Sequence, residues 1–285
     1  MNEKEVKNQW HQGFYGAMEL ELREDAHNLT FERERNLGKE PLRMDMLVIK
    51  KSKDLPIANE IGHIFRKHNV IEYKSPRDGL SIDDYVKTVG YACIYKSLAN
   101  TTDEIPVEDI TITIVRDIFP GEMIKKLNSL GNKVEEVTKG IYYVSGNTMF
   151  LTQIVVTSQL TEEHTWLRVL TDRIEEQDVI NFSREGKKLT TQGEKYNIDA
   201  IYQVSVKANR KFYEELKRRD KDMCEALMEL MKPELEEEYK DGFSDGKIKQ
   251  LAESIRNLMD SLKYSYDEAC DVLKVEDKEK YRNLI

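Results

Sequence analysis

Three charged residues lie inside two apolar runs of this sequence, where charge is costly. Residues 44–49 (MDMLVI) and 71–74 (IEYK) each read as a strand, and they contain Asp45, Glu72 and Lys74. A carboxylate or ammonium group is almost never buried without a partner, so these residues predict an ion-pair network or a metal site. Side chains alternate along a strand, so Glu72 and Lys74 share one face while Tyr73 points to the other.

If the two strands are neighbours with Asp45 on that face, one cavity holds two carboxylates and an amine. Mg²⁺ is usually bound by one or two carboxylates and keeps water at its other positions. A bound metal lowers the pKa of a water and neutralises charge that grows on a phosphate. The residues therefore predict the chemistry of a divalent-metal phosphodiesterase, in which Lys74 positions the water, acts as a base or stabilises the charge.

The same residues also have structural interpretations. Asp45 could form an ion pair at the strand end with Arg43, which could itself contact substrate phosphate. Lys74 could be a salt-bridge partner, because an acidic residue two positions before a lysine is common on solvated strands. The spacing alone is therefore weak, and the order of the surrounding elements has to support it.

The first predicted helix places a carboxylate where an apolar residue is expected. At about 100° per residue, Glu21 falls near the centre of an apolar stripe and Glu19 lies nearly opposite Trp10. The stripe consists of Trp10, Phe14, Ala17, Met18 and Leu22. One interpretation is that Glu21 pairs with Arg23 or with an exposed lysine.

The order of elements adds weight to the charged strands. An amphipathic helix is followed by two strands joined at residues 36–39 (NLGK), then by the strand with Glu72 and Lys74, then by a helix over about residues 82–98. In this order the sequence resembles the PD-(D/E)xK nuclease superfamily, in particular its recombination-promoting nuclease/putative transposase family. The resemblance covers about residues 10–120, with a weaker one in the C-terminal helices. It departs from the motif at Met44, where the name-giving proline would stand.

The resemblance implies a restriction-endonuclease-like central mixed sheet flanked by helices. It also implies a Mg²⁺-dependent DNA endonuclease of the transposase-associated type, with Mn²⁺ as a substitute ion. Asp45, Glu72 and Lys74 match the catalytic positions. The predicted metal ligands are Asp45, Glu72, the Tyr73 carbonyl and Glu21, because many members place a carboxylate of the first helix beside the metal. Lys87 is the candidate for the polar side chain that the next helix often contributes.

The remaining pattern predicts an α/β fold in which helices flank a central sheet. Residues 109–115, 141–144 and 152–157 read as strands, and a helix begins at residues 120–122. Residues 1–160 are predicted to form the nuclease-like core. Residues 161–285 form a mostly helical extension, whose last helices pack on themselves or on a second copy of the chain.

The helix over residues 82–98 carries apolar and aromatic residues at helical spacing. Val86, Val89, Cys93 and Leu98 predict its buried stripe, and Tyr85, Tyr91 and Tyr95 are interpreted as packing residues in preference to substrate contacts. The chain has three cysteines, Cys93, Cys224 and Cys270, which are widely scattered. Neither a disulfide framework nor a zinc site is therefore expected.

The charge balance argues against a simple nucleic-acid-binding protein. The net charge is −9, with 16 basic and 16 acidic residues in positions 1–100 and 28 basic against 37 acidic in the rest. Attraction to a polyanion normally needs the opposite sign, so DNA binding requires a local patch. The candidate patch consists of Lys50, Lys51, Lys53, Arg66, Lys67 and Arg77. No apolar run of about 18 residues and no signal-peptide pattern occurs, which predicts a cytoplasmic protein without a membrane segment.

Two functions from different classes fit these observations. The first is the metal-dependent DNA endonuclease, which the paired carboxylates favour. The second is a non-catalytic nuclease-fold protein that binds DNA or a protein partner through its helical tail, which the acidic C-terminal part favours.

Overall fold

The structure is a computed structural model that describes residues 3–36, 43–52, 55–219 and 266. The chain forms two compact units, residues 1–230 and 231–285. All helices and strands with described bounds lie in the first unit, and the predicted boundary near residue 160 falls inside it. The connection at residues 37–39 and the predicted last helices lie outside the described residues.

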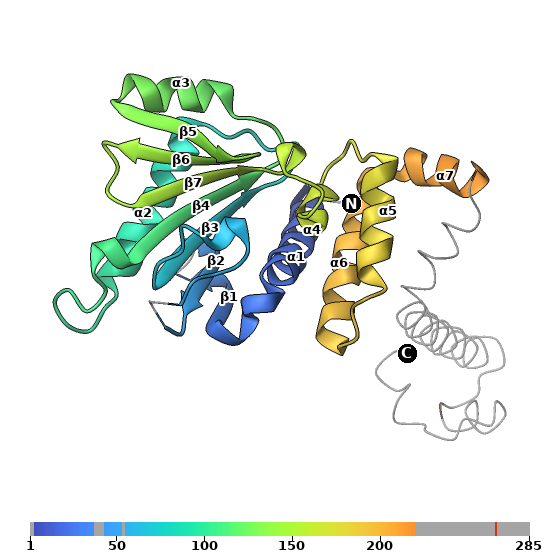
Figure 1. The fold of residues 1–285 in the computed structure, drawn as a ribbon, viewed down its shortest axis with the longest axis horizontal. Helices are drawn as coiled ribbons and strands as arrows, with labels where there is room; N and C mark the ends of the chain where they lie inside the picture. The colour runs from blue at the N-terminus through green and yellow to red at the C-terminus, as the bar shows by residue number, and fades with distance from the viewer. Residues whose placement is uncertain (1–2, 37–42, 53–54, 220–265, 267–285) are drawn as a thin grey trace. The chain divides into compact units, whose positions relative to one another are not determined.

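A seven-stranded mixed sheet forms the centre of this unit (Figure 1). The strand order is β1-β2-β3-β4-β7-β6-β5, in which β3, β4 and β7 run parallel and the other neighbours antiparallel. The strands are β1 (Leu29–Asn36), β2 (Arg43–Lys50), β3 (His68–Lys74), β4 (Ile110–Arg116), β5 (Asn132–Thr138), β6 (Ile141–Gly146) and β7 (Leu151–Val156). The predicted α/β class with a central sheet flanked by helices is therefore confirmed.

Helices cover both faces of the sheet. They are α1 (Glu3–Glu21), α2 (Ile82–Ser97), α3 (Gly121–Ser129), α4 (Thr165–Arg168), α5 (Glu176–Gly186), α6 (Gln192–Ala208) and α7 (Arg210–Arg219). Phe14 of α1 packs with Ile71 and Tyr73 in one apolar core, and Tyr91 of α2 packs with Val70 in the other. Helix α6 lies along α1 (Figure 1). Because both of its faces are covered, six of the seven residues of β3 are buried, including the polar Asn69, Glu72 and Lys74.

The buried face of α2 differs from the predicted one. Val86 is 58% exposed, Leu98 is 51% exposed, and Cys93 is also exposed, so the predicted apolar stripe is wrong. The buried side chains are instead those of Tyr85, Thr88, Tyr91, Ala92 and Tyr95. The packing role predicted for the three tyrosines is confirmed. Their large apolar area sets the rotation of the helix more strongly than smaller aliphatic residues do.

None of the helices in the described part of the chain is long and apolar enough to cross a membrane.

A buried asparagine joins the three strands that carry the candidate site. Asn69 of β3 is fully buried, and its Nδ2 donates to the carbonyls of Val48 (3.0 Å) and Arg66 (2.8 Å). Its Oδ1 accepts from the Arg66 backbone N–H (2.8 Å) and from Thr111 Oγ1 (2.7 Å). Since Val48 lies on β2 and Thr111 on β4, this one side chain fixes the level of β3 against both neighbours.

Replacing Asn69 with Ala should lower the free energy of unfolding by about 2–4 kcal/mol, because it leaves several buried polar groups without partners. Denaturant unfolding of the parent and the variant measures this difference. Asn147→Ala is the matched control, because Asn147 is exposed and donates one bond, to the Leu130 carbonyl. Equal losses in the two variants would contradict the assigned role of Asn69.

Candidate functional site

Asp45 and Glu72 lie at one level of two neighbouring strands. β2 pairs antiparallel with β3 from Met46 opposite Ile71 to Ile49 opposite His68, so Asp45 and Glu72 both lie just beyond the same end of the paired segment. Asp45 is also tied to β3 through its Oδ2, which accepts a hydrogen bond of 2.9 Å from the Tyr73 backbone N–H. The predicted adjacency of the two strands is confirmed.

The pKa of Glu72 reflects its burial and the nearby charge of Asp45. Its side chain is 4% exposed, and its Oε2 has no hydrogen-bond partner among the described residues. Burial and then the negative charge of Asp45 raise the pKa of Glu72 to about 7, against the lowering effect of Lys74. A buried carboxylate whose charge is disfavoured, with a second carboxylate nearby and an oxygen that has no partner among the described residues, is a donor set suited to a divalent cation.

Lys74 lies beside this pair as an anchored cation. Its Nζ is 2.9 Å from Asp84 Oδ1 and 3.5 Å from Glu72 Oε1. Burial lowers the pKa of Lys74, but the hydrogen bond to Asp84 and the charge of Glu72 outweigh it, so the pKa is raised. Lys74 is therefore an ammonium ion near neutral pH, which favours charge stabilisation over proton abstraction. Tyr73 points to the opposite face, as predicted, where its ring stacks on Phe14 at 4.4 Å between centroids.

Asp84 is a site residue that sequence reasoning missed. It lies in the first turn of α2, where its Oδ2 accepts hydrogen bonds from the backbone N–H and hydroxyl of Ser81. Burial opposes its charge, but the bonds from Ser81 and Lys74 hold the pKa of Asp84 at about 2. The signal was a Ser-x-x-Asp capping box directly after the strand with Lys74. This cap orients the carboxylate and leaves Oδ1 for Lys74.

Two further cations surround the carboxylate pair. Lys87 lies one turn after Asp84, with its Nζ 5.1 Å from the centre of the Tyr91 ring. Burial lowers the pKa of Lys87, but Tyr91 and the charge of Glu72 raise it overall, which is consistent with the predicted place near the site. On β4, Arg116 is paired in register with Lys74; its side chain is buried and its Nε has no hydrogen-bond partner among the described residues.

Helix α1 contributes a histidine to the pair. His11 Nε2 lies 3.5 Å from Asp45 Oδ1, and the His11 ring meets Tyr73 edge to face at 5.8 Å. Tyr15, one turn later, has a raised pKa, first because of burial and then because of the charge of Asp45. The sequence does not single out His11, because nothing in the pattern of α1 shows that this residue contacts Asp45 of β2.

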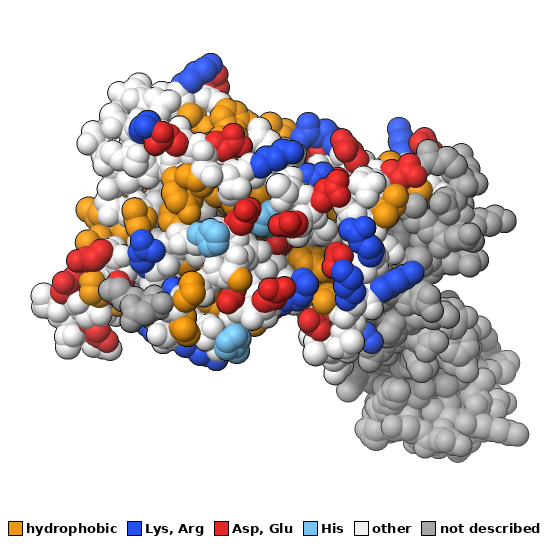
Figure 2. Space-filling model, viewed as in Figure 1, with side chains coloured by type: hydrophobic (Ala, Val, Ile, Leu, Met, Phe, Trp, Pro, Cys, Tyr) orange, Lys and Arg blue, Asp and Glu red, His pale blue; other side chains and the backbone are white. Residues whose placement is uncertain are grey.

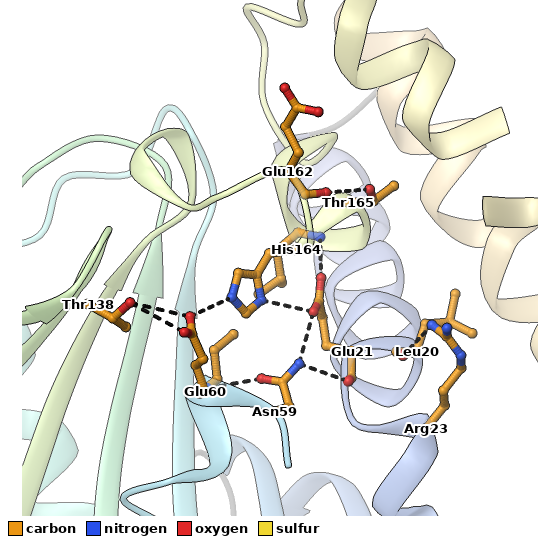
Figure 3. A network of polar contacts seen from close by, with 11 residues as sticks. Leu20, Glu21, Arg23, Asn59, Glu60, Thr138, Glu162, His164 and Thr165 are labelled. Atoms are coloured by element: carbon orange, nitrogen blue, oxygen red, sulfur yellow. Dashed lines mark hydrogen bonds and ion pairs between the residues drawn. The ribbon is translucent and has the colours of Figure 1, made fainter. Parts of the chain in front are cut away.

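Glu21, the carboxylate predicted from α1, belongs to a different network (Figure 3). Its Oε2 lies 3.0 Å from His164 Nδ1 and accepts from Asn59 Nδ2 at 3.2 Å. The other ring nitrogen of His164 lies 3.4 Å from Glu60 Oε2, on the short 3-10 helix η2 (Glu60–Gly62). The partner of Glu21 is therefore a histidine through Oε2, while its Oε1 accepts from the Leu167 backbone N–H at 3.4 Å, and neither of the two partners suggested from the sequence is used.

The predicted three-carboxylate metal site does not form. In the described ranges, no three His, Cys, Asp or Glu side chains are grouped so that they could hold a metal ion. Arg23, the other suggested partner of Glu21, donates to the Leu20 carbonyl at 3.3 Å instead. Glu19 pairs with Arg33 at 2.7 Å, away from Glu21. The donor set that remains for a metal is Asp45 and Glu72, and the Tyr73 carbonyl stays a prediction.

The predicted basic patch is divided between two ends of the sheet. Lys50 is buried, and Lys67 Nζ donates to the Lys50 and Lys51 carbonyls at 2.6 and 3.0 Å. Arg77 follows the other end of β3, roughly 20 Å away at about 3.3 Å per residue, and pairs with Asp172. Lys53 lies outside the described residues. Figure 2 shows acidic and basic side chains interspersed over one face of the molecule.

Replacing Glu21 with Gln should lower the free energy of unfolding by about 1–3 kcal/mol, because it weakens the buried contact with His164. The same change should leave Mg²⁺ affinity unaltered. Denaturant unfolding and metal titration of one preparation test both parts, with Glu19→Gln as the control for a carboxylate on the same helix. Weaker Mg²⁺ binding in Glu21→Gln alone would return Glu21 to the metal site.

His164 should make stability depend on pH. It is 3% exposed, and although burial lowers its pKa, Glu21 and Glu60 raise it overall. A raised pKa in the folded state stabilises the protein fully below about pH 6.5, and this contribution is lost as pH rises through the folded pKa. Unfolding by urea across this range should give a falling free energy for the parent and a flatter profile for His164→Gln. Exposed His63 supplies the control, and a parallel pair of profiles for parent and His164→Gln would refute the assignment.

Comparison with protein-family models, with curated proteins and with solved structures finds no match to this chain. The geometry of Asp45, Glu72 and Lys74 is therefore the basis on which a function can be assigned. The order of elements around these residues supplies the second line of support.

Proposed function

We propose that this chain is a metal-dependent DNA endonuclease of the transposase-associated type, which hydrolyses phosphodiester bonds at Asp45, Glu72 and Lys74. The observation that carries the proposal is the proximity of two carboxylates at one end of the paired strands β2 and β3, with a lysine 3.5 Å from the more buried one. A structural ion pair needs one carboxylate for each cation. Here the second carboxylate raises the pKa of the first, which a structural role does not require.

The order of elements supports the same proposal. Helix α1, strands β1 to β3, helix α2 and strand β4 follow one another along the chain, and β4 returns parallel to β3. This is the order expected for a restriction-endonuclease-like core. It brings the start of β2 and the end of β3 near the start of α2. Each proposed catalytic side chain thus projects from a strand, and the capped first turn of α2 supports Lys74.

The side chains have distinct tasks in the proposed reaction. Asp45 and Glu72 would hold Mg²⁺ or Mn²⁺, with the Tyr73 carbonyl as the predicted third ligand. When bound, such an ion supplies an acidified water and neutralises charge on the phosphate. Lys74 stabilises negative charge on the scissile phosphate as an ammonium ion, and Arg116 and Lys87 add positive charge nearby. Asp84 acts as a positioning residue, because it fixes the Lys74 ammonium group.

The alternative is a non-catalytic nuclease-fold protein that binds DNA or a protein partner. It is favoured by the finding that no three His, Cys, Asp or Glu side chains in the part of the chain that the structure describes are grouped so that they could hold a metal ion. The excess of acidic residues in positions 101–285 favours it too. A protein of this kind does not use Lys74 for catalysis. Replacing Lys74 therefore distinguishes the two functions.

Replacing Lys74 with Met should lower the rate of DNA cleavage by about 100-fold or more, the usual cost of losing one charge-stabilising donor. Metal affinity should change little, because Lys74 is not a ligand. Cleavage of plasmid DNA in Mg²⁺ measures the first, and calorimetric titration the second. Lys125→Met is the matched control, since Lys125 is an exposed lysine that also pairs with a glutamate. Cleavage by Lys74→Met at the parent rate would end the proposal.

A further inference from the structure

A pocket of about 470 Å³ opens where β4 and β7 end. These strands are parallel, with Arg116 opposite Val156, so Asp117 and Thr157 follow at the same level. Neighbouring strands lie about 5 Å apart, which sets the two side chains beside each other. The loop between α4 and α5 closes the other side of the pocket with Arg173.

Two buried polar atoms at this pocket lack a hydrogen-bond partner among the described residues. Asp117 is 2% exposed and Thr157 is 1% exposed. Asp117 Oδ2 accepts from Thr171 Oγ1 and from Arg173 Nη2, both at 3.0 Å, but its Oδ1 has no partner. Thr157 Oγ1 has none either. Buried polar groups are nearly always paired, so a free acceptor beside a free hydroxyl indicates a ligand that donates to one and bonds to the other.

The rim of the pocket carries the other features of a nucleotide site. Phe119 lines the pocket and is 41% exposed, and its ring centre lies 5.2 Å from that of Tyr142. The Arg173 side chain is 59% exposed while Asp117 holds one end of its guanidinium group. Aromatic faces stack bases without sequence preference, and a guanidinium group binds phosphate oxygens through a fork of donors.

The pocket lies one residue beyond the level of Lys74. Arg116 is the register partner of Lys74 on the neighbouring strand, and Asp117 follows it directly. Arg77, three residues after Lys74, reaches Asp172 of the pocket loop at 3.6 Å. Lys74 and the pocket therefore lie at the same edge of the sheet, where one nucleic-acid strand has both within its path.

We propose that this pocket binds an unpaired base of the DNA strand next to the cleaved phosphate, a subsite that rests on the proposed endonuclease function. An exocyclic amino group donates to Asp117 Oδ1, and Thr157 Oγ1 bonds to the adjacent ring nitrogen. Phe119 stacks on the base and Arg173 binds its phosphate. Adenine, cytosine and guanine carry such an amino group, whereas thymine presents a carbonyl at that place and is disfavoured.

Binding of the four deoxynucleoside monophosphates to the full chain tests the subsite without any cleavage step. We expect dAMP, dCMP and dGMP to bind about tenfold more tightly than dTMP, and Phe119→Ala to weaken all four by about tenfold, the scale of one lost stacking contact. Thr157→Val should weaken binding of all four, because a hydroxyl can bond to the ring nitrogen of each base. Tyr196→Ala is the matched control, because Tyr196 is an exposed aromatic residue outside this pocket. Calorimetric titration gives the affinities, and thermal unfolding confirms that each variant is folded.

The outcomes separate the subsite from the nuclease. Phe119-dependent binding in a protein that cleaves no DNA supports the pocket and refutes the endonuclease. Cleavage of DNA by a protein that binds no mononucleotide overturns the pocket alone. Binding that survives Phe119→Ala but is lost in Lys74→Met places the nucleotide at the candidate site and also overturns it.

Discussion

The candidate site depends on the repulsion between the negative charge of Asp45 and the buried carboxylate of Glu72. Antiparallel pairing of β2 with β3 brings the two carboxylates to the same end of the paired strands, and burial denies Glu72 the water that would otherwise screen its charge. Lys74 lies beside Glu72 and is fixed by Asp84. Lys87 is affected by the charge of Glu72, and Arg116 is the register partner of Lys74. A free buried oxygen on Glu72 remains, and a divalent ion is the simplest group that would satisfy it.

The scaffold makes this conflict hard to relax. β3 is covered on both faces, and Asn69 ties it to β2 and β4 through two buried hydrogen bonds, to the Val48 carbonyl and from the Thr111 hydroxyl. A shift of one residue would turn Glu72 to the other face, where Tyr73 packs on Phe14. On that side, His164 joins α1 to η2 through Glu21 and Glu60. Helix α1 thus contributes to both polar networks, through Glu21 to His164 and through His11 to Asp45.

The sequence was most informative where charge interrupts an apolar strand. The pairing of Asp45 with Glu72 and the place of Lys74 follow from alternation and from adjacent strands, which are local rules. The apolar stripe of α1 correctly identifies Glu21 as unusual. Its partner His164 is 143 positions away, so no local sequence pattern predicts the contact. Asp84 and His11 were missed for a related reason, since each matters only through a neighbour on another element. Strand β5 is a charged, exposed edge strand without the apolar alternation that identifies a strand from sequence.

The most direct test of the central claim is calorimetric titration of the full chain with Mg²⁺, in the parent and in Glu72→Gln. If the conflict between Asp45 and Glu72 exists to hold a cation, the parent binds Mg²⁺ and Glu72→Gln binds it at least about tenfold more weakly. Binding of equal strength in the two proteins, or none in the parent, would contradict the assignment of these carboxylates as a metal site.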